Sequence, residues 1–308
     1  MSTYYKILPE DLKCKDFQYH EGLNIDVKPI TPRQCDNGLH FSDARHILSF
    51  CGYGTMIAEV EIPEDAVVYH FAGQSKADKI ILKNIRPFLS VDTIKALIRE
   101  GMNIETDKDN LLCSAAKAGY LDVVKYLVEQ GANIHAGNDF ALCLASEREH
   151  LEVVKYLVMQ GADIHADDDY ALRWASRSGY FDTVKYLVEQ GANIHARDDC
   201  ALCFASKYGH LNVVKYLVEQ GANIHANCED ALRCASYNKY FEIVKYLVEQ
   251  GADVHIFDDY LLRMASQYGC LDLVRYLVEH GANIHARDGE AIQHAGTPKI
   301  KKYLKSLK

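Results

Sequence analysis

Apolar residues along most of the chain follow a helical spacing, and the whole pattern returns every 30 residues. Each copy contains a stretch of the form ALxxAS, as at residues 141–146, which predicts a short first helix. A second stretch, such as VVKYLV at residues 153–158, predicts a second helix that ends at Gly161 with a left-handed C-cap. The polar, aspartate-rich segment that follows, residues 162–169, predicts a turn or hairpin leading to the next copy.

The copies account for residues 76–308, and residues 1–75 form a separate unit. Six full copies occupy residues 109–288, a degenerate copy occupies residues 79–108, and a truncated copy occupies residues 289–308. Neither helix of a copy is long enough to be stable alone, and each has an apolar face that only a neighbouring copy covers. We therefore expect a mainly α solenoid of stacked helix pairs. In the last copy, KIKKYLKSLK places apolar side chains on one face and lysines around the other, which predicts a polar end cap; a nuclear-localisation signal is the alternative.

The repeated segments resemble those of the ankyrin repeat family. The string VVKYLVEQGANIHA at Val123 and Val213 looks like the family's second helix with its terminal glycine and loop, and residues 205–217 look like the turn between the two helices. The family's T-P-L-H start of the first helix is reduced here to A-L-C or A-L-R, and each copy is shorter than the usual ~33 residues. The resemblance therefore implies a shorter, less projecting hairpin. The spacing and the NIHA ending resemble in particular the ankyrin repeat proteins of mimivirus-like giant amoeba viruses.

The residues ahead of the copies have a mixed pattern that predicts a small α+β domain. Apolar and acidic residues alternate in TMIAEVEIP at residues 55–63, as in a half-buried strand, and AVVYHF at residues 66–71 predicts a second strand. Residues 43–51 have helical spacing, with Ser42 as the N-cap.

This unit resembles an uncharacterised domain that precedes ankyrin arrays in such viral proteins, through the segments CDNGLHF, AEVEIP and KADKIIL. A second resemblance, through His20 to Gly22 and residues 38–44, is to the order of NAD-binding elements in ADP-ribosyltransferases. It would make the unit a small enzyme that the array delivers to a target, although the unit is far shorter than that family.

The composition of the chain argues against several classes of partner and location. The net charge of -9 and the pI near 5.9 argue against a nucleic-acid partner, and no stretch reaches the ~20 apolar residues that a membrane span needs. Cys113, Cys143 and Cys203 share one slot of the repeat, so free thiols in a reducing compartment are expected. These features predict a monomeric cytoplasmic protein, in the host cytoplasm if the source is viral.

Candidate metal and catalytic residues are few. Histidines recur at one position of six copies, and we expect each imidazole to hydrogen-bond loop backbone, because stacked copies hold parallel side chains too far apart to share a metal. Cys200, Cys203, Cys228 and Cys234 have the only zinc-like spacing, which core packing explains as well. The sequence predicts no metal, no cofactor and no enzyme activity in the array.

Positions that vary between near-identical copies are the candidate binding surface. By resemblance to ankyrin proteins, the hairpin tips and the exposed side of the first helices form a concave binding face, and Tyr, Trp and Arg often dominate interface energetics. The candidates are Phe140, Glu147, Tyr170, Arg173, Trp174, Arg177, Lys207, Arg233, Tyr237, Tyr260 and Arg263. The alternative is that these positions are merely unconstrained.

Carboxylates along the expected hairpin edge suggest the charge of the partner. They are Asp167, Asp168, Asp169, Asp198, Asp199, Glu229, Asp230, Asp258 and Asp259, and they favour a partner with a basic or mixed-charge surface. The sequence therefore predicts a scaffold that binds a protein, from the host if the source is viral. A structural component of a particle is the remaining alternative.

Overall fold

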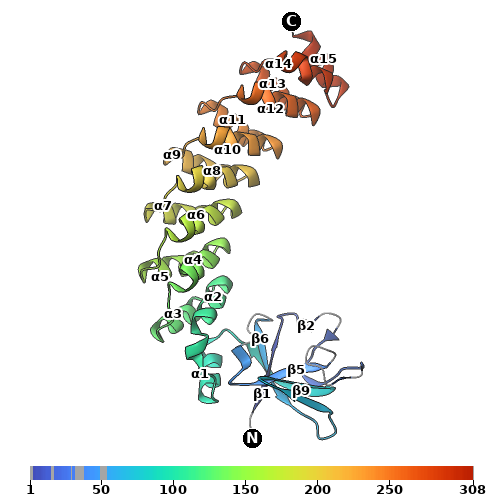
Figure 1. The fold of residues 1–308 in the computed structure, drawn as a ribbon, viewed down its shortest axis with the longest axis vertical. Helices are drawn as coiled ribbons and strands as arrows, with labels where there is room; N and C mark the ends of the chain where they lie inside the picture. The colour runs from blue at the N-terminus through green and yellow to red at the C-terminus, as the bar shows by residue number, and fades with distance from the viewer. Residues whose placement is uncertain (1–2, 15–16, 29, 32–37, 49–53, 308) are drawn as a thin grey trace. The chain divides into compact units, whose positions relative to one another are not determined.

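The computed structural model describes residues 3–14, 17–28, 30–31, 38–48 and 54–307 (Figure 1). Contacts divide the chain into two compact units, residues 1–141 and 142–308. The first unit contains a β-sheet and the earliest helices, and the second contains most of the repeat array.

Seven strands form one antiparallel sheet near the N-terminus. They are β1 (Tyr4–Leu8), β4 (Gly22–Ile25), β5 (Leu39–Asp43), β6 (Met56–Glu61), β7 (Val68–Phe71), β8 (Gln74–Ala77) and β9 (Lys79–Pro87). Their order in the sheet is β4-β9-β6-β1-β5-β8-β7, and β2 (Lys13–Cys14) pairs separately with β3 (Phe17–Gln18).

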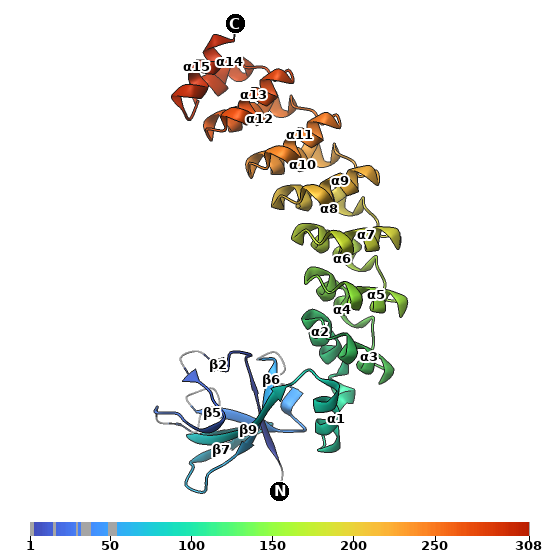
Figure 2. The same ribbon diagram turned by 180° about the vertical axis from the view of Figure 1, so that it is seen from behind.

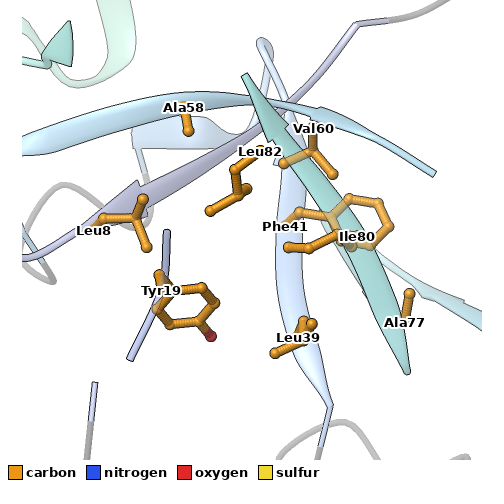
Figure 3. Packing of buried hydrophobic residues seen from close by; sticks show 9 residues of the cluster. All are labelled: Leu8, Tyr19, Leu39, Phe41, Ala58, Val60, Ala77, Ile80 and Leu82. Atoms are coloured by element: carbon orange, nitrogen blue, oxygen red, sulfur yellow. The ribbon is translucent and has the colours of Figure 1, made fainter. Parts of the chain in front are cut away.

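A buried apolar cluster lies along this sheet (Figure 3). Its members are Leu8, Tyr19, Leu39, Phe41, Ala58, Val60, Ala77, Ile80 and Leu82. In β6 the predicted alternation is confirmed, because Ala58 and Val60 are buried in this cluster while Glu59 and Glu61 pair with cations of β9. The strand predicted at residues 66–71 is confirmed as β7.

Two expectations for this unit differ from the structure. Ser42 does not cap a helix: it lies buried within β5, and its hydroxyl donates a hydrogen bond to the carbonyl of Gly73 at 2.8 Å. Residues 44–46 form a turn, and residues 49–51 of the expected helix, with Cys35 of the CDNGLHF segment, lie outside the described residues. The sheet also continues past residue 75 to Pro87, so the residues expected to begin the degenerate copy instead form strand β9.

The array consists of the predicted helix pairs. After α1 (Val91–Arg99) and a short 3-10 helix at Ile104–Thr106, the first helices are α2 (Lys108–Ala118), α4 (Ala136–Glu147), α6 (Ala166–Ser178), α8 (Ala196–Tyr208), α10 (Ala226–Tyr237), α12 (Ile256–Gln267) and α14 (Ala286–Gln293). The second helices are α3 (Leu121–Glu129), α5 (Leu151–Met159), α7 (Phe181–Glu189), α9 (Leu211–Glu219), α11 (Phe241–Glu249), α13 (Leu271–Glu279) and α15 (Pro298–Ser306).

Helices of the same kind stack on one another within the second unit. First helices follow the order α6, α8, α10, α12 and α14, and α7, α9 and α11 stack in the same way (Figures 1 and 2). The alanines at the start of each AS pair, such as Ala175 and Ala205, are fully buried and allow the close approach. Full burial of a leucine such as Leu187 contributes about 1.5–3 kcal/mol to each copy.

The predicted end of the second helices and the predicted cap of the array are both present. Gly161 has φ +96°, its N–H donates to the carbonyl of Val158, and the N–H of Ala162 donates to Leu157, which is the Schellman arrangement. In α15, Ile300 and Leu304 are buried while the lysines around them are exposed, so this helix closes the stack as a polar cap.

The segment predicted as a turn or hairpin is a left-handed turn. Among described residues from 107 to 307 no strand is present, and Asp167, Asp168 and Asp169 have φ of 50°, 53° and 56° at the start of α6. Equivalent turns occupy residues 137–139, 197–199, 227–229, 257–259 and 287–289. Each non-glycine residue in this region costs about 1 kcal/mol or more, and Asp, Asn and Gly tolerate it best. The shortened copies therefore need both this composition and hydrogen bonds that hold the turn.

Candidate functional site

A recurring hydrogen-bond arrangement holds these turns, and the repeated histidines are part of it. His165 Nδ1 lies 3.1 Å from Asp169 Oδ1, and the same oxygen accepts the backbone N–H of Asn193, 24 residues later, at 2.7 Å. Asn193 Oδ1 in turn accepts the N–H of His195 at 3.0 Å, and His195 Nδ1 continues to Asp199. We call this repeating connection the turn lattice. It contradicts the expectation that the imidazoles bond loop backbone, because the partner is a carboxylate four residues later.

The turn lattice also changes the predicted acidic edge. Asp169, Asp199, Glu229 and Asp259 are buried, so they cannot attract a partner as expected. The other turn aspartates are exposed, but Arg197 Nε lies 2.9 Å from Asp168 and Arg287 Nε lies 3.2 Å from Asp258. The edge therefore presents paired charges of both signs.

Two of the predicted partner-contacting arginines serve the turns instead. Arg173 is 5% exposed, and its Nε and Nη2 donate to the carbonyls of Asp168 and Asp167 at 2.9 and 2.7 Å. Arg263 is 6% exposed and donates in the same way to Asp258 and Phe257. Burial leaves these side chains little surface for a partner.

Three other predicted residues belong to a half-buried aromatic and cationic group on α6 and α8. Tyr170 and Trp174 stack with ring centroids 5.2 Å apart, and Phe204 lies 6.3 Å from Trp174. The guanidinium carbon of Arg177 is 4.2 Å from the centroid of Trp174 and 5.1 Å from that of Tyr208. We call these five residues the helix-face patch. Such cation–π contacts hold the guanidinium above the rings.

Sequence reasoning missed two members of the helix-face patch. Phe204 lies one period after Trp174, so comparison of the two copies could have found it. Tyr208 varies between copies in the same way, and Lys207 beside it is exposed with Nζ 5.8 Å from its ring centroid.

The remaining candidates are spread over other copies. Tyr237 is 62% exposed and meets Tyr268 edge-on at 6.1 Å. Tyr260 is half-buried against Arg263, with 5.6 Å from the guanidinium carbon to the ring centroid. Phe140 is exposed and Glu147 is half-buried.

The cysteines with zinc-like spacing are only partly brought together. Cys203 and Cys234 lie side by side with Asp230. Cys228 is exposed in the left-handed turn at the start of α10. Arg233, another predicted partner residue, is half-buried and binds Asp230 at 2.6 Å. All eight described cysteines are free thiols, as expected.

The N-terminal sheet contains a buried cation that no sequence pattern predicts. Lys6 Nζ donates to the carbonyl of His40 at 2.7 Å and lies 4.6 Å from the ring centroid of Tyr19. Burial lowers the pKa of Lys6 to about 8 and raises the pKa of Tyr19. His20, from the transferase-like motif, is exposed and bonds the carbonyl of Glu21, so these residues show no nucleophile with its base.

Comparisons with known proteins agree with this architecture. A family model described as ankyrin repeats in three copies matches residues 135–198, 172–258 and 202–288, and a single ankyrin repeat matches residues 107–139. Residues 2–91 match a domain of unknown function (DUF7666), which agrees with the resemblance stated for the N-terminal unit.

Two similar relatives are ankyrin repeat proteins of Acanthamoeba polyphaga mimivirus. R229 is 36% identical over 34% of this chain and 38% of its own length, and R896 is 34% identical over 38% of each. The chain thus spans well under half the length of these relatives. The crystal structure of the human ASB11 ankyrin repeat domain is similar with a TM-score of 0.57 and 26% identity, covering 64% of this chain and 97% of that domain.

Proposed function

Because the chain belongs to the ankyrin repeat family, a general protein–protein interaction module, we propose that it is a scaffold that binds a protein through the helix-face patch. The observation that supports this most is the gathering of the half-buried Trp174 and Arg177 with their aromatic neighbours on two adjacent first helices, α6 and α8. Aromatic and arginine side chains provide much of the binding energy in protein interfaces.

The charges of this surface suggest the chemistry of the partner. Arg177 and Lys207 are cations beside apolar rings, while the paired charges at Asp168 and Asp258 lie along the turns. A segment that presents a carboxylate to Arg177 and an apolar side chain to Trp174 would fit this arrangement. The proposed partner surface is therefore mixed in charge, rather than mainly basic.

The proposal assigns no reaction and no cofactor to the chain, which would act as a monomer in the cytoplasm. No helix in the part of the chain that the structure describes has the length and apolar character needed to cross a membrane. The mimivirus relatives make a host protein of the amoeba the first partner to seek.

The test is capture of partners by the full chain from amoebal lysate, followed by measurement of affinity for the recovered protein. The double change Trp174→Ala with Arg177→Ala should weaken binding by about 30-fold or more, the loss typical of a hot spot. The matched control is Lys185→Ala with Tyr186→Ala on α7, which alters a cation and an aromatic ring of a second helix.

Circular dichroism would establish that both variants keep their helices. A partner that the patch variant retains, and that the control variant loses, would contradict the assignment of the binding surface.

A further inference from the structure

A cluster of three possible metal ligands joins two neighbouring copies of the array. Cys203 on α8 places its Sγ 3.0 Å from Asp230 Oδ2 and 3.7 Å from Cys234 Sγ, and Cys234 Sγ is 3.7 Å from Asp230 Oδ1. Asp230 and Cys234 are four residues apart on α10, so they lie on the same side of that helix. All three side chains are partly exposed, which gives an ion a way in.

These separations can be compared with the edges of a tetrahedral zinc site. With Zn–S bonds of about 2.3 Å and Zn–O bonds of about 2.0 Å, tetrahedral angles place two sulfurs about 3.8 Å apart and a sulfur and an oxygen about 3.5 Å apart. The sulfur pair at 3.7 Å matches this edge. The sulfur–oxygen separations are 3.0 Å from Cys203 Sγ to Oδ2 and 3.7 Å from Cys234 Sγ to Oδ1, so they involve both oxygens of Asp230. One ligand atom from each residue lies within 4.8 Å of the other two, so a small rotation of the carboxylate would bring a single oxygen to both sulfurs. A disulfide would instead require the sulfurs to approach to about 2.05 Å.

The charges around the cluster would balance a divalent cation. Two thiolates and one carboxylate carry three negative charges, and a divalent ion with the guanidinium of Arg233 supplies three positive charges. Arg233 Nη2 binds Asp230 Oδ1 at 2.6 Å, which leaves Oδ2 directed toward Cys203.

Neighbouring copies show that this arrangement has a structural cost. Arg173 and Arg263 donate through Nε to a turn carbonyl, whereas Nε of Arg233 is buried without a hydrogen-bond partner. In the same copy, the buried Glu229 leaves Oε2 without a partner. Unpaired buried polar atoms are rare in folded proteins and each needs an explanation. Here Arg233 is held by Asp230 instead of the turn.

We propose that Cys203, Asp230 and Cys234 form a binding site for a thiophilic divalent cation such as Zn²⁺. The two thiolates and the carboxylate occupy three positions of a tetrahedron, and the fourth is open to water or to a donor from another molecule. This replaces the interpretation of these cysteines as core packing, and it does not depend on the proposed interaction function.

The test uses the full chain, kept reduced, and titrates it with Co²⁺ as a spectroscopic stand-in for Zn²⁺. One equivalent should produce thiolate-to-cobalt charge-transfer absorption and the visible bands of a tetrahedral site, and Zn²⁺ should abolish both. Cys203→Ser, Cys234→Ser and Asp230→Asn should each weaken binding by more than about tenfold, the smaller end of losses seen even for outer-shell changes.

Matched controls separate this site from other donors in the chain. Cys228→Ser alters an exposed thiol near the same helix, and Asp198→Asn removes an exposed turn carboxylate; both should bind Co²⁺ like the unchanged chain. Melting followed by circular dichroism should show that Zn²⁺ raises the unfolding temperature of the controls but not of Asp230→Asn. The proposal is overturned if the reduced chain gives no charge-transfer absorption, or if the absorption survives the loss of both Cys203 and Cys234.

Discussion

The turns at residues 197–199 and 227–229 have the same left-handed backbone but satisfy their polar groups differently. Asp199 Oδ1 accepts from His195 of the preceding copy at 3.1 Å and from the backbone N–H of Asn223 at 2.8 Å. Glu229 accepts from His225 at 2.5 Å through Oε1, while Oε2 has no partner. The backbone thus tolerates either carboxylate, whereas the turn lattice depends on the shorter one.

The largest difference between the two turns should appear when each carboxylate is removed. Asp199→Ala deletes the acceptor for His195 and for the backbone N–H of Asn223, so we expect the free energy of unfolding to fall by about 2–3 kcal/mol. Glu229→Ala deletes the acceptor for His225 alone, together with an unpaired oxygen, so the expected fall is about 1 kcal/mol. Urea unfolding followed by the fluorescence of Trp174, the only tryptophan, measures both. Equal losses would show that the lattice does not couple copies.

An intermediate effect is expected from the arginines that follow each kind of turn. Arg173→Met leaves the carbonyls of Asp167 and Asp168 without their donor, and should cost about 1–2 kcal/mol. Arg233→Met removes a half-buried ion pair with Asp230 and an unpaired Nε, and should cost under about 1 kcal/mol. Thermal unfolding of the two variants compares them directly. The reverse order would mean that Arg233 supports its turn by a route other than Asp230.

The smallest effect is expected from exchanging the two acids. Glu229→Asp should raise the free energy of unfolding by about 0.5–1 kcal/mol, because the shorter side chain can place one oxygen between His225 and the following copy. The reciprocal change, Asp199→Glu, should lower it by a similar amount. Urea midpoints of both variants are the measurement, and a loss of stability in Glu229→Asp would show that the longer side chain is the better fit in that copy.

Local periodicity explains which parts of the fold the sequence predicts. The helix pairs, the cap at Gly161 and strand β6 follow from spacings within a few residues. The sequence pattern places residues 79–87 in the degenerate copy, whereas they form strand β9. The place of β9 between β4 and β6 depends on residues far away in the sequence, which a local pattern does not reveal.

The turn lattice and the cysteine cluster can be recognised in the sequence only by comparing equivalent positions of different copies. A turn aspartate such as Asp169 is expected to be exposed, yet the same position is acidic in six consecutive copies, from Asp109 to Asp259, while its neighbours vary. Arg233 occupies the position of Cys203 in the following copy, and Asp230 and Cys234 lie on either side of Arg233 in the sequence. Stacking of the two copies therefore brings Asp230 and Cys234 next to Cys203. The burial of Arg173 followed from the left-handed turn, whose conformation the sequence did not reveal.

The turn lattice has a consequence for how such a chain can change length over generations. The aspartate of each regular copy binds the backbone of that copy's own asparagine and the histidine of the preceding copy, so it forms the joint between the two copies. Duplication or loss of 30 codons therefore restores the same contacts at the new joint wherever both flanking copies are regular. A breakpoint beside the copy that contains Glu229 would instead transmit its unpaired oxygen to a new neighbour.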